Sequence, residues 1–311
     1  MRRLLWILLV LGLIGAGVFW LLTAPRTIEA AALPNHVPDP VNGELVFNAG
    51  GCASCHASRP AGACQGKAPD KKLLGGGHCL KTPFGTFSVP NISPDETAGI
   101  GRWSDAAFAT AMLRGVSPAG EHYYPAFPYT SYQRMRLEDV IDLKAYLMTL
   151  PKATTVAPPH DLALPFRLRR GLGLWKTLFL DGKPFQLDPA RDAEYNRGGY
   201  LVEGMAHCGE CHSPRNALGG IKVAMKLAGG PAPEGPGWIP NITPAPDGIP
   251  DWTKEDIASA LGTGLLPNGD SFGGAMVAVQ ENMAKLPASD RLAIAAYLKS
   301  LPPVANPKPG K

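Results

Sequence analysis

Two short cysteine motifs constrain this chain more than any bulk property does. The pentad Cys-X-X-Cys-His occurs at residues 52–56 and again at residues 208–212. Its spacing places two thiols about one helical turn apart, so both can form thioethers with one haem while the adjacent histidine binds the iron. The motifs therefore predict two covalently bound haem c groups, held by Cys52, Cys55 and His56 in the first motif and by Cys208, Cys211 and His212 in the second.

Other uses of paired cysteines fit this spacing poorly. A zinc ribbon needs two pairs roughly 15 to 20 residues apart, whereas Cys55 and Cys208 are 153 positions apart. A thioredoxin-type redox pair needs a βαβ neighbourhood, which the sequence does not suggest. Neither alternative explains the histidine that follows each pair.

The two motifs belong to a duplicated segment. Each is reached through a stretch of fourteen residues, 43–56 and 199–212. A Pro-Asn-Ile-[Ser/Thr]-Pro loop, a tryptophan before a predicted helix, and an apolar closing helix ending in Leu-Pro then recur in the same order, at residues 90–94 and 240–244, at Trp103 and Trp252, and at residues 137–150 and 289–301. A repeat of this size matches a small domain rather than a solenoid unit.

The organisation that follows is an all-α fold with two tandem cytochrome c domains. No stretch alternates with period two over enough residues to predict a substantial sheet. The first repeat spans residues 37–152 and the second spans residues 190–305, with a connector at 153–189 and a tail at 306–311. The connector carries a basic cluster, Arg167, Arg169 and Arg170, which is either a solvated face or a docking site for an acidic partner.

Residues 1–26 are predicted to anchor the chain in a membrane. Leu4 to Leu22 are nineteen residues without a charge, which as a helix would nearly span the hydrocarbon core of about 30 Å. A cleaved signal peptide is the alternative, but the small residues Ala30–Ala32 lie far beyond the apolar stretch. Arg2 and Arg3 place the N-terminus inside. We therefore expect the inner membrane of a Gram-negative bacterium, with the haem domains in the periplasm.

The chain resembles the membrane-bound di-haem cytochromes c related to the cytochrome subunits of bacterial quinoprotein and flavoprotein dehydrogenases for alcohol, gluconate and sorbitol. The resemblance covers most of residues 37–305. It rests on the two pentads, the two loops, and residues 99–103, 120–125, 211–219 and 296–301. The alcohol dehydrogenase subunits carry three such domains, and this chain carries two.

The resemblance implies a methionine as sixth ligand to each iron. In the second repeat the match falls on Met276, and Met283 is expected to pack in the core. In the first repeat the family's Tyr-Pro-Ala-Met-Pro-Tyr reads Tyr-Pro-Ala-Phe-Pro-Tyr at residues 124–129. We expect Met135 to ligate the first iron and Phe127 to pack against the ring. His122 as ligand and an open site behind Phe127 remain alternatives.

Further residues are expected around the haems. Trp103, Trp252, Tyr146, Tyr297 and Arg215 are candidates for the haem pockets. Cys64 and Cys79 have no counterpart in the second repeat, and in an oxidising compartment a disulfide is the default for them, with a thiolate ligand as the alternative. His36, His78, His160 and His207 are expected to be surface or loop residues.

These features predict an electron carrier rather than an enzyme. The 30 Lys+Arg against 26 Asp+Glu leave a net charge of +4, too small to suggest a nucleic-acid partner. The expected role is transfer of electrons from a periplasmic dehydrogenase subunit or other donor towards the respiratory chain. The alternative is a haem enzyme with an open or Cys-ligated iron, of the di-haem peroxidase or thiosulfate-oxidising type.

Overall fold

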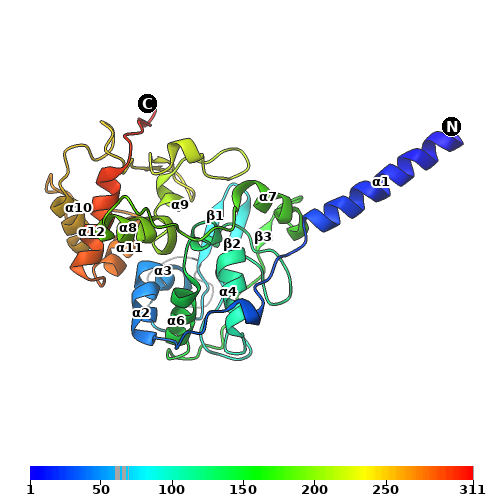
Figure 1. Ribbon diagram of the computed structural model, residues 1–311, viewed down its shortest axis with the longest axis horizontal. Helices are drawn as coiled ribbons and strands as arrows, with labels where there is room; N and C mark the ends of the chain where they lie inside the picture. Colours follow the sequence, from blue (N-terminus) through cyan, green and yellow to red (C-terminus); the bar gives the residue numbers. More distant parts are fainter. Residues whose placement is uncertain (60–63, 65–67, 69, 311) are drawn as a thin grey trace.

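The computed structural model describes residues 1–59, 64, 68 and 70–310. Helix α1 (Arg2–Leu22) projects from a body in which the first repeat lies nearer to α1 and the second repeat lies at the far end (Figure 1). Within the described residues, α1 is the one helix long and apolar enough to cross a membrane, and none of its tested window is buried. Residues 306–310 of the predicted tail have no regular structure, and residue 311 lies outside the described residues.

The helices of the first repeat are arranged around a close crossing of its first and last members. They are α2 (Pro40–Ala49), α3 (Cys52–His56), α4 (Asp105–Arg114), α5 (Tyr129–Tyr132) and α6 (Leu137–Leu147). Asp39 caps α2, with Pro40 at the first helical position. The crossing of α2 and α6 depends on Gly43, because a Cβ there would lie 2.0 Å from the Asp142 carbonyl oxygen.

The second repeat uses the same crossing. Its elements are α8 (Ala193–Tyr200), a π-helical turn (Leu201–Met205), α9 (Gly209–His212), a 3-10 turn (Val223–Met225), α10 (Lys254–Thr263), α11 (Ala275–Met283) and α12 (Ala288–Ser300). Here α8 crosses α12 at Gly198, whose Cβ would lie 1.8 Å from the Ala293 carbonyl oxygen. A capping box at Thr253 and Asp256 begins α10.

The π-helical turn corrects the sequence alignment of the repeats by one position. The sequence pairs Gly43 with Gly199, but the residue that makes the equivalent helix contact is Gly198. The second repeat thus has one more residue between the crossing and its motif. The bond from the Ala206 N–H to the Leu201 carbonyl, five residues back, absorbs that residue in a π turn.

The fold is mainly helical, with two small sheets that the sequence did not indicate. Strands β1 (Cys79–Thr82), β2 (Gly85–Ser88) and β3 (Asp161–Leu162) form an antiparallel sheet in that order, and β4 (Gly230–Pro231) pairs with β5 (Trp238–Ile239). The hairpin of β1 and β2 lies between the first motif and its proline loop, and β4 and β5 pair in the corresponding part of the second repeat. These strands are too short for alternating polarity to reveal them in the sequence.

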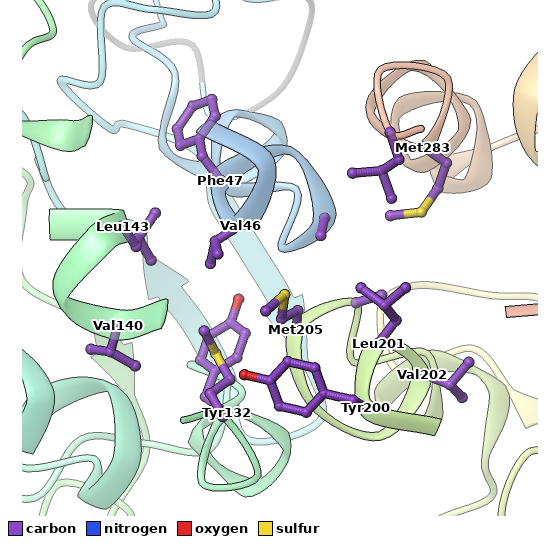
Figure 2. Close-up of a cluster of buried hydrophobic side chains, with 14 of the residues drawn as sticks. Val46, Phe47, Tyr132, Val140, Leu143, Tyr200, Leu201, Val202, Met205 and Met283 are labelled. Atoms are coloured by element: carbon purple, nitrogen blue, oxygen red, sulfur yellow. The ribbon is translucent and has the colours of Figure 1, made fainter. Parts of the chain in front are cut away.

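One hydrophobic core runs through both repeats. Val46 and Leu143 from the first repeat and Leu201 and Met205 from the second belong to a single cluster, and all four are at most 2% exposed. Figure 2 shows Met205 between the side chains of the first repeat and those of the second. The repeats are therefore packed together rather than joined only by the connector.

The connector binds the base of α1. It contains a 3-10 turn (Arg169–Gly171) followed by α7 (Leu172–Phe179). A Cβ on Gly173 would lie 2.6 Å from the Thr23 Cα atom, so the backbone of α7 touches the first residue after α1. A short 3-10 turn (Ala30–Ala32) follows on the way to α2.

Candidate haem sites

Each cysteine motif forms a short helix that presents its side chains from one turn. The first motif is α3, which begins after Gly51 in the left-handed conformation (φ 58°). The second motif consists of Cys208 followed by the four residues of α9. Among the described residues the four motif cysteines are reduced, and burial raises the pKa of Cys52 and Cys208 to about 12. Because these thiols are neutral and form no disulfide, they are available for thioether bonds to a haem.

The two motif histidines have the same hydrogen bond. Nδ1 of His56 donates to the Pro90 carbonyl at 2.9 Å, and Nδ1 of His212 donates to the Pro240 carbonyl at 2.9 Å. Burial lowers the pKa of both imidazoles, that of His56 to about 4. The bond fixes the ring and leaves the neutral Nε2 available to a metal, the arrangement in which histidine binds iron.

An asparagine in each loop holds the proline carbonyl in place. The Asn91 side chain donates to the Ala153 carbonyl at 2.6 Å and accepts from the Ser93 N–H. Asn241 donates to the Val304 carbonyl at 2.8 Å and accepts from the Thr243 N–H. In both repeats the acceptor lies two residues after the proline that ends the closing helix. The loop is thereby tied to that helix.

A glycine that the sequence motifs did not single out packs beneath each loop. Gly76 and Gly229 both have φ 73°, and a Cβ on either would lie 2.6 Å or less from backbone of the proline loop. Their N–H groups donate to the carbonyls of His56 (2.8 Å) and His212 (2.7 Å). The signal was present in the sequence, as Leu-Gly-Gly at residues 74–76 and Leu-Ala-Gly at residues 227–229.

Three methionines lie beside Cys52 of the first motif. Met135 is 2% exposed and lines a small cavity together with Cys52, Met112 and Met205. Phe127 is half-buried, with its ring centroid 5.6 Å from that of Tyr132, another lining residue. Met135 and Phe127 thus lie on the same side of the first repeat, where the sequence places its sixth ligand.

His122 occupies a different environment. Its Nε2 donates to the Thr23 carbonyl at 2.8 Å, and its Nδ1 accepts from Lys176 Nζ at 3.1 Å. Both ring nitrogens are therefore engaged at the junction of α1 and α7. This geometry argues against His122 as an iron ligand.

In the second repeat the two methionines differ in burial. Met283 is 3% exposed and belongs to the shared core. Met276 lies near the start of α11 and is only half-buried. It follows Gly273 and Gly274, where an added Cβ would meet no atom within 4 Å. An open approach leaves room for a thioether to reach a ring, and Met276 stays the predicted ligand.

Comparison with known proteins decides the family. A family model described as cytochrome c matches residues 40–151. A di-haem c-type cytochrome of Cereibacter sphaeroides is 49% identical over 98% of this chain and 100% of its own length. The chain belongs to the cytochrome c family. It carries two covalently bound haem c groups, which we assign to its two Cys-X-X-Cys-His motifs.

Other relatives are subunits of larger dehydrogenases. The cytochrome subunit of fructose dehydrogenase from Gluconobacter japonicus is 37% identical over 87% of the chain, and a nicotinate dehydrogenase subunit from Pseudomonas putida is 40% identical over 83%. The chain spans about half of the first protein (54%) and about a fifth of the second (21%).

The remaining predicted pocket residues fall into two groups. Tyr146 and Tyr297 occupy equivalent places, and their hydroxyls donate to Glu44 (3.1 Å) and Glu203 (3.0 Å). Trp103 and Trp252 are half-buried against the shared core. Arg215 instead forms an ion pair with Glu210 at 2.7 Å and donates to the Gly219 carbonyl, so its partners here are protein groups.

The additional cysteines of this cytochrome form a disulfide. Cys64 and Cys79 are joined, with their Cα atoms 4.8 Å apart. Cys79 begins strand β1, so the disulfide ties the loop after the first motif to the small sheet. A bonded sulfur is not a thiolate, and the alternative of cysteine ligation has no support here.

Hydrogen bonds tie the segment of each haem motif to the other repeat. Asn282 of α11 donates to the Ser54 hydroxyl inside the first motif at 2.9 Å. His207, directly before the second motif, donates to the Gly50 carbonyl at 3.2 Å, and its ring packs against Tyr132 with centroids 5.6 Å apart. His207 is a loop residue, as expected, and it lies between the two motif-bearing segments.

Glu210, within the second motif, contributes a buried carboxylate to the same interface. It accepts hydrogen bonds from the hydroxyls of Thr130 (2.6 Å) and Ser131 (2.7 Å) of α5, besides its ion pair with Arg215. Burial favours the neutral acid, but the Arg215 charge and the hydroxyl donors outweigh it and lower the pKa of Glu210. The sequence alone gives Glu210 no role, because its hydroxyl partners lie about 80 residues away.

Proposed function

We propose that this cytochrome carries electrons in the periplasm, from a membrane-associated dehydrogenase towards the respiratory chain. It comprises two tandem cytochrome c domains, residues 37–152 and 190–305, on a single N-terminal anchor in the inner membrane. The relatives that are dehydrogenase cytochrome subunits support a dehydrogenase as the electron donor. Haem attachment beyond the inner membrane supports the periplasmic side.

The contacts that tie each motif segment to the other repeat carry this proposal. Residues flanking or inside each motif touch the other motif's repeat directly, through Asn282 and Ser54 and through His207 and Gly50. An electron that enters at one haem can therefore reach the other without leaving the packed protein.

The sixth ligands decide between carrier and enzyme. We assign Met135 to the first iron and Met276 to the second, which closes both irons to exogenous ligands. Met135 is favoured because it is buried beside Cys52. Phe127 covers the same side of the first haem.

The test is to mix the reduced, fully haem-loaded chain with carbon monoxide, and the oxidised chain with cyanide or peroxide, in a stopped-flow spectrometer. A carrier with two closed irons should show no rapid spectral change at either haem. Rapid binding at one haem would contradict the proposal and favour the peroxidase or thiosulfate-oxidising class.

The donor is tested separately. The full chain should co-purify from detergent-solubilised membranes with a subunit that contains a flavin, a quinone cofactor or molybdenum. Adding that subunit's substrate should reduce both haems. Reduction of neither haem would contradict the proposed donor.

A further inference from the structure

In the connector, large apolar side chains face the solvent while a lysine faces the interior. On α7, Lys176 points inward and is 8% exposed, whereas Leu174 and Leu178, four positions apart on one side of the helix, are 41% and 66% exposed. The preceding turn exposes Leu164, Phe166 and Leu168 by 72%, 42% and 66%. We call these five apolar residues the connector patch. Soluble surfaces seldom gather so many large apolar side chains in one short segment.

The buried cation on the other side explains how α7 keeps this orientation. Lys176 Nζ donates to the carbonyls of Arg114 (2.7 Å) and Gly115 (2.6 Å) and to Nδ1 of His122 (3.1 Å). Its three protons therefore have three acceptors, and the ammonium also lies 4.7 Å from the ring centroid of Tyr129. α7 is locked with its leucines outward.

The contacts of α7 with the end of α1 determine how deep the connector patch lies relative to the membrane. Thr23 follows α1 directly, and it touches Gly173 and accepts a hydrogen bond from Arg170 Nε at 2.9 Å. The Arg170 guanidinium also covers the Trp20 ring, 4.0 Å from its centroid. Because α1 ends where the hydrocarbon core ends, α7 must lie at the depth of the lipid headgroups. Figure 1 shows α7 beside the base of α1.

The charge of the segment suits an anionic lipid surface. Apart from the buried Lys176, residues 163–179 contain Arg167, Arg169 and Arg170 and no Asp or Glu. Exposed leucines and a phenylalanine flanked by arginines form the composition that inserts into the boundary between headgroups and acyl chains.

We propose that the connector patch lies in the surface of the membrane that holds α1, with its apolar side chains among the acyl chains and the neighbouring arginines at anionic phospholipid headgroups. The contact rests on the proposed anchor. With a second attachment beside the first, the haem domains are held in one orientation over the bilayer instead of swinging on a tether.

The test uses the full haem-loaded chain in vesicles of equal parts phosphatidylcholine and phosphatidylglycerol that contain a photoactivatable lipid. After illumination, mass spectrometry should find lipid on α1 and on residues 163–179. Peptides around Leu265, which is also exposed (62%) but follows α10 at the far end of the molecule, should be unlabelled.

A double variant, Leu174→Gln with Leu178→Gln, separates the two attachments. It should stay in the vesicles through α1 while labelling of residues 163–179 falls roughly tenfold. In vesicles of phosphatidylcholine alone, wild-type labelling of that segment should also fall. Unchanged labelling in the double variant, or labelling confined to α1 in the wild type, would overturn the proposal and leave the patch to a protein partner. An unlabelled α1 would overturn the anchor as well.

Discussion

The two repeats differ little on the histidine side of their haems and strongly on the opposite side. The bonds from the motif histidines to the loop prolines are 2.9 Å in both repeats, and a glycine with φ 73° lies beneath each loop. The methionine candidates, by contrast, come from different positions, one deeply buried and one half-buried. The histidine side thus has the same geometry in both repeats, whereas our proposed sixth ligands come from two different places.

The largest effect is expected at the two glycines beneath the proline loops, where the backbones approach closely. Gly76→Ala and Gly229→Ala should each cost about 3 kcal/mol or more in free energy of unfolding, because the new Cβ would meet loop backbone at 2.5–2.6 Å in a strained conformation. Chemical denaturation of the purified cytochrome measures this.

The control for these variants is Gly120→Ala. Gly120 has φ 76° but nothing within 4 Å of the added Cβ. It should cost only the left-handed backbone term of about 1 kcal/mol. Equal losses at all three positions would show that the loop contact is unimportant.

The next effect belongs to the first repeat alone. Replacing Cys64 and Cys79 by serine should lower stability by about 3 kcal/mol, because the disulfide joins residues 15 apart and restricts the unfolded chain. Reducing the disulfide of the wild type should lower its thermal unfolding temperature as much as the double substitution does. A variant that melts at the wild-type temperature would contradict this expectation.

The loop asparagines provide a matched comparison between the repeats. Asn91→Ala and Asn241→Ala should each cost about 2 kcal/mol, because each removes the shorter of two hydrogen bonds to the carbonyl beyond the closing helix and leaves a loop N–H without its acceptor. If the two loops contribute equally to the free energy of unfolding, the two losses should agree within about 0.5 kcal/mol. A large loss at one position only would break the comparison.

The smallest effect concerns a carboxylate that only the first repeat has. Asp142 accepts from the Asp39 N–H (2.7 Å), from Asn42 (2.8 Å) and from His36 (2.6 Å), whereas the equivalent residue of the second repeat is Ala293. Burial alone would raise the pKa of Asp142, but these donors together lower it below its usual value of 3.8.

Because the folded pKa is depressed, this stabilisation is fully present above pH 3.8 and is lost as the pH falls through the lower folded value. Asp142→Asn should cost about 1 kcal/mol at neutral pH and less in acid. Unfolding measured across acidic pH checks this. A loss that stays constant down to the lowest pH would contradict the assignment.

The histidine side could largely be predicted from sequence, because its parts are contiguous motifs of fixed spacing. The π-helical turn could not, because Gly198 and Gly199 are adjacent and only the crossing with α12 shows that Gly198 is the equivalent of Gly43. Glu210 and His207 were missed because their partners lie in the other repeat. The inward orientation of Lys176 on α7 likewise depends on carbonyls some sixty residues away.

We assign a methionine to each of the two irons. The most direct test of this assignment is the weak near-infrared band that methionine-ligated haem shows when oxidised. The wild type should have the intensity of two such haems, and Met135→Leu and Met276→Leu should each have that of one. Met112→Leu and Met205→Leu, at buried methionines in the same cavity as Met135, should keep both. A Met135→Leu spectrum identical to that of the wild type would contradict the account.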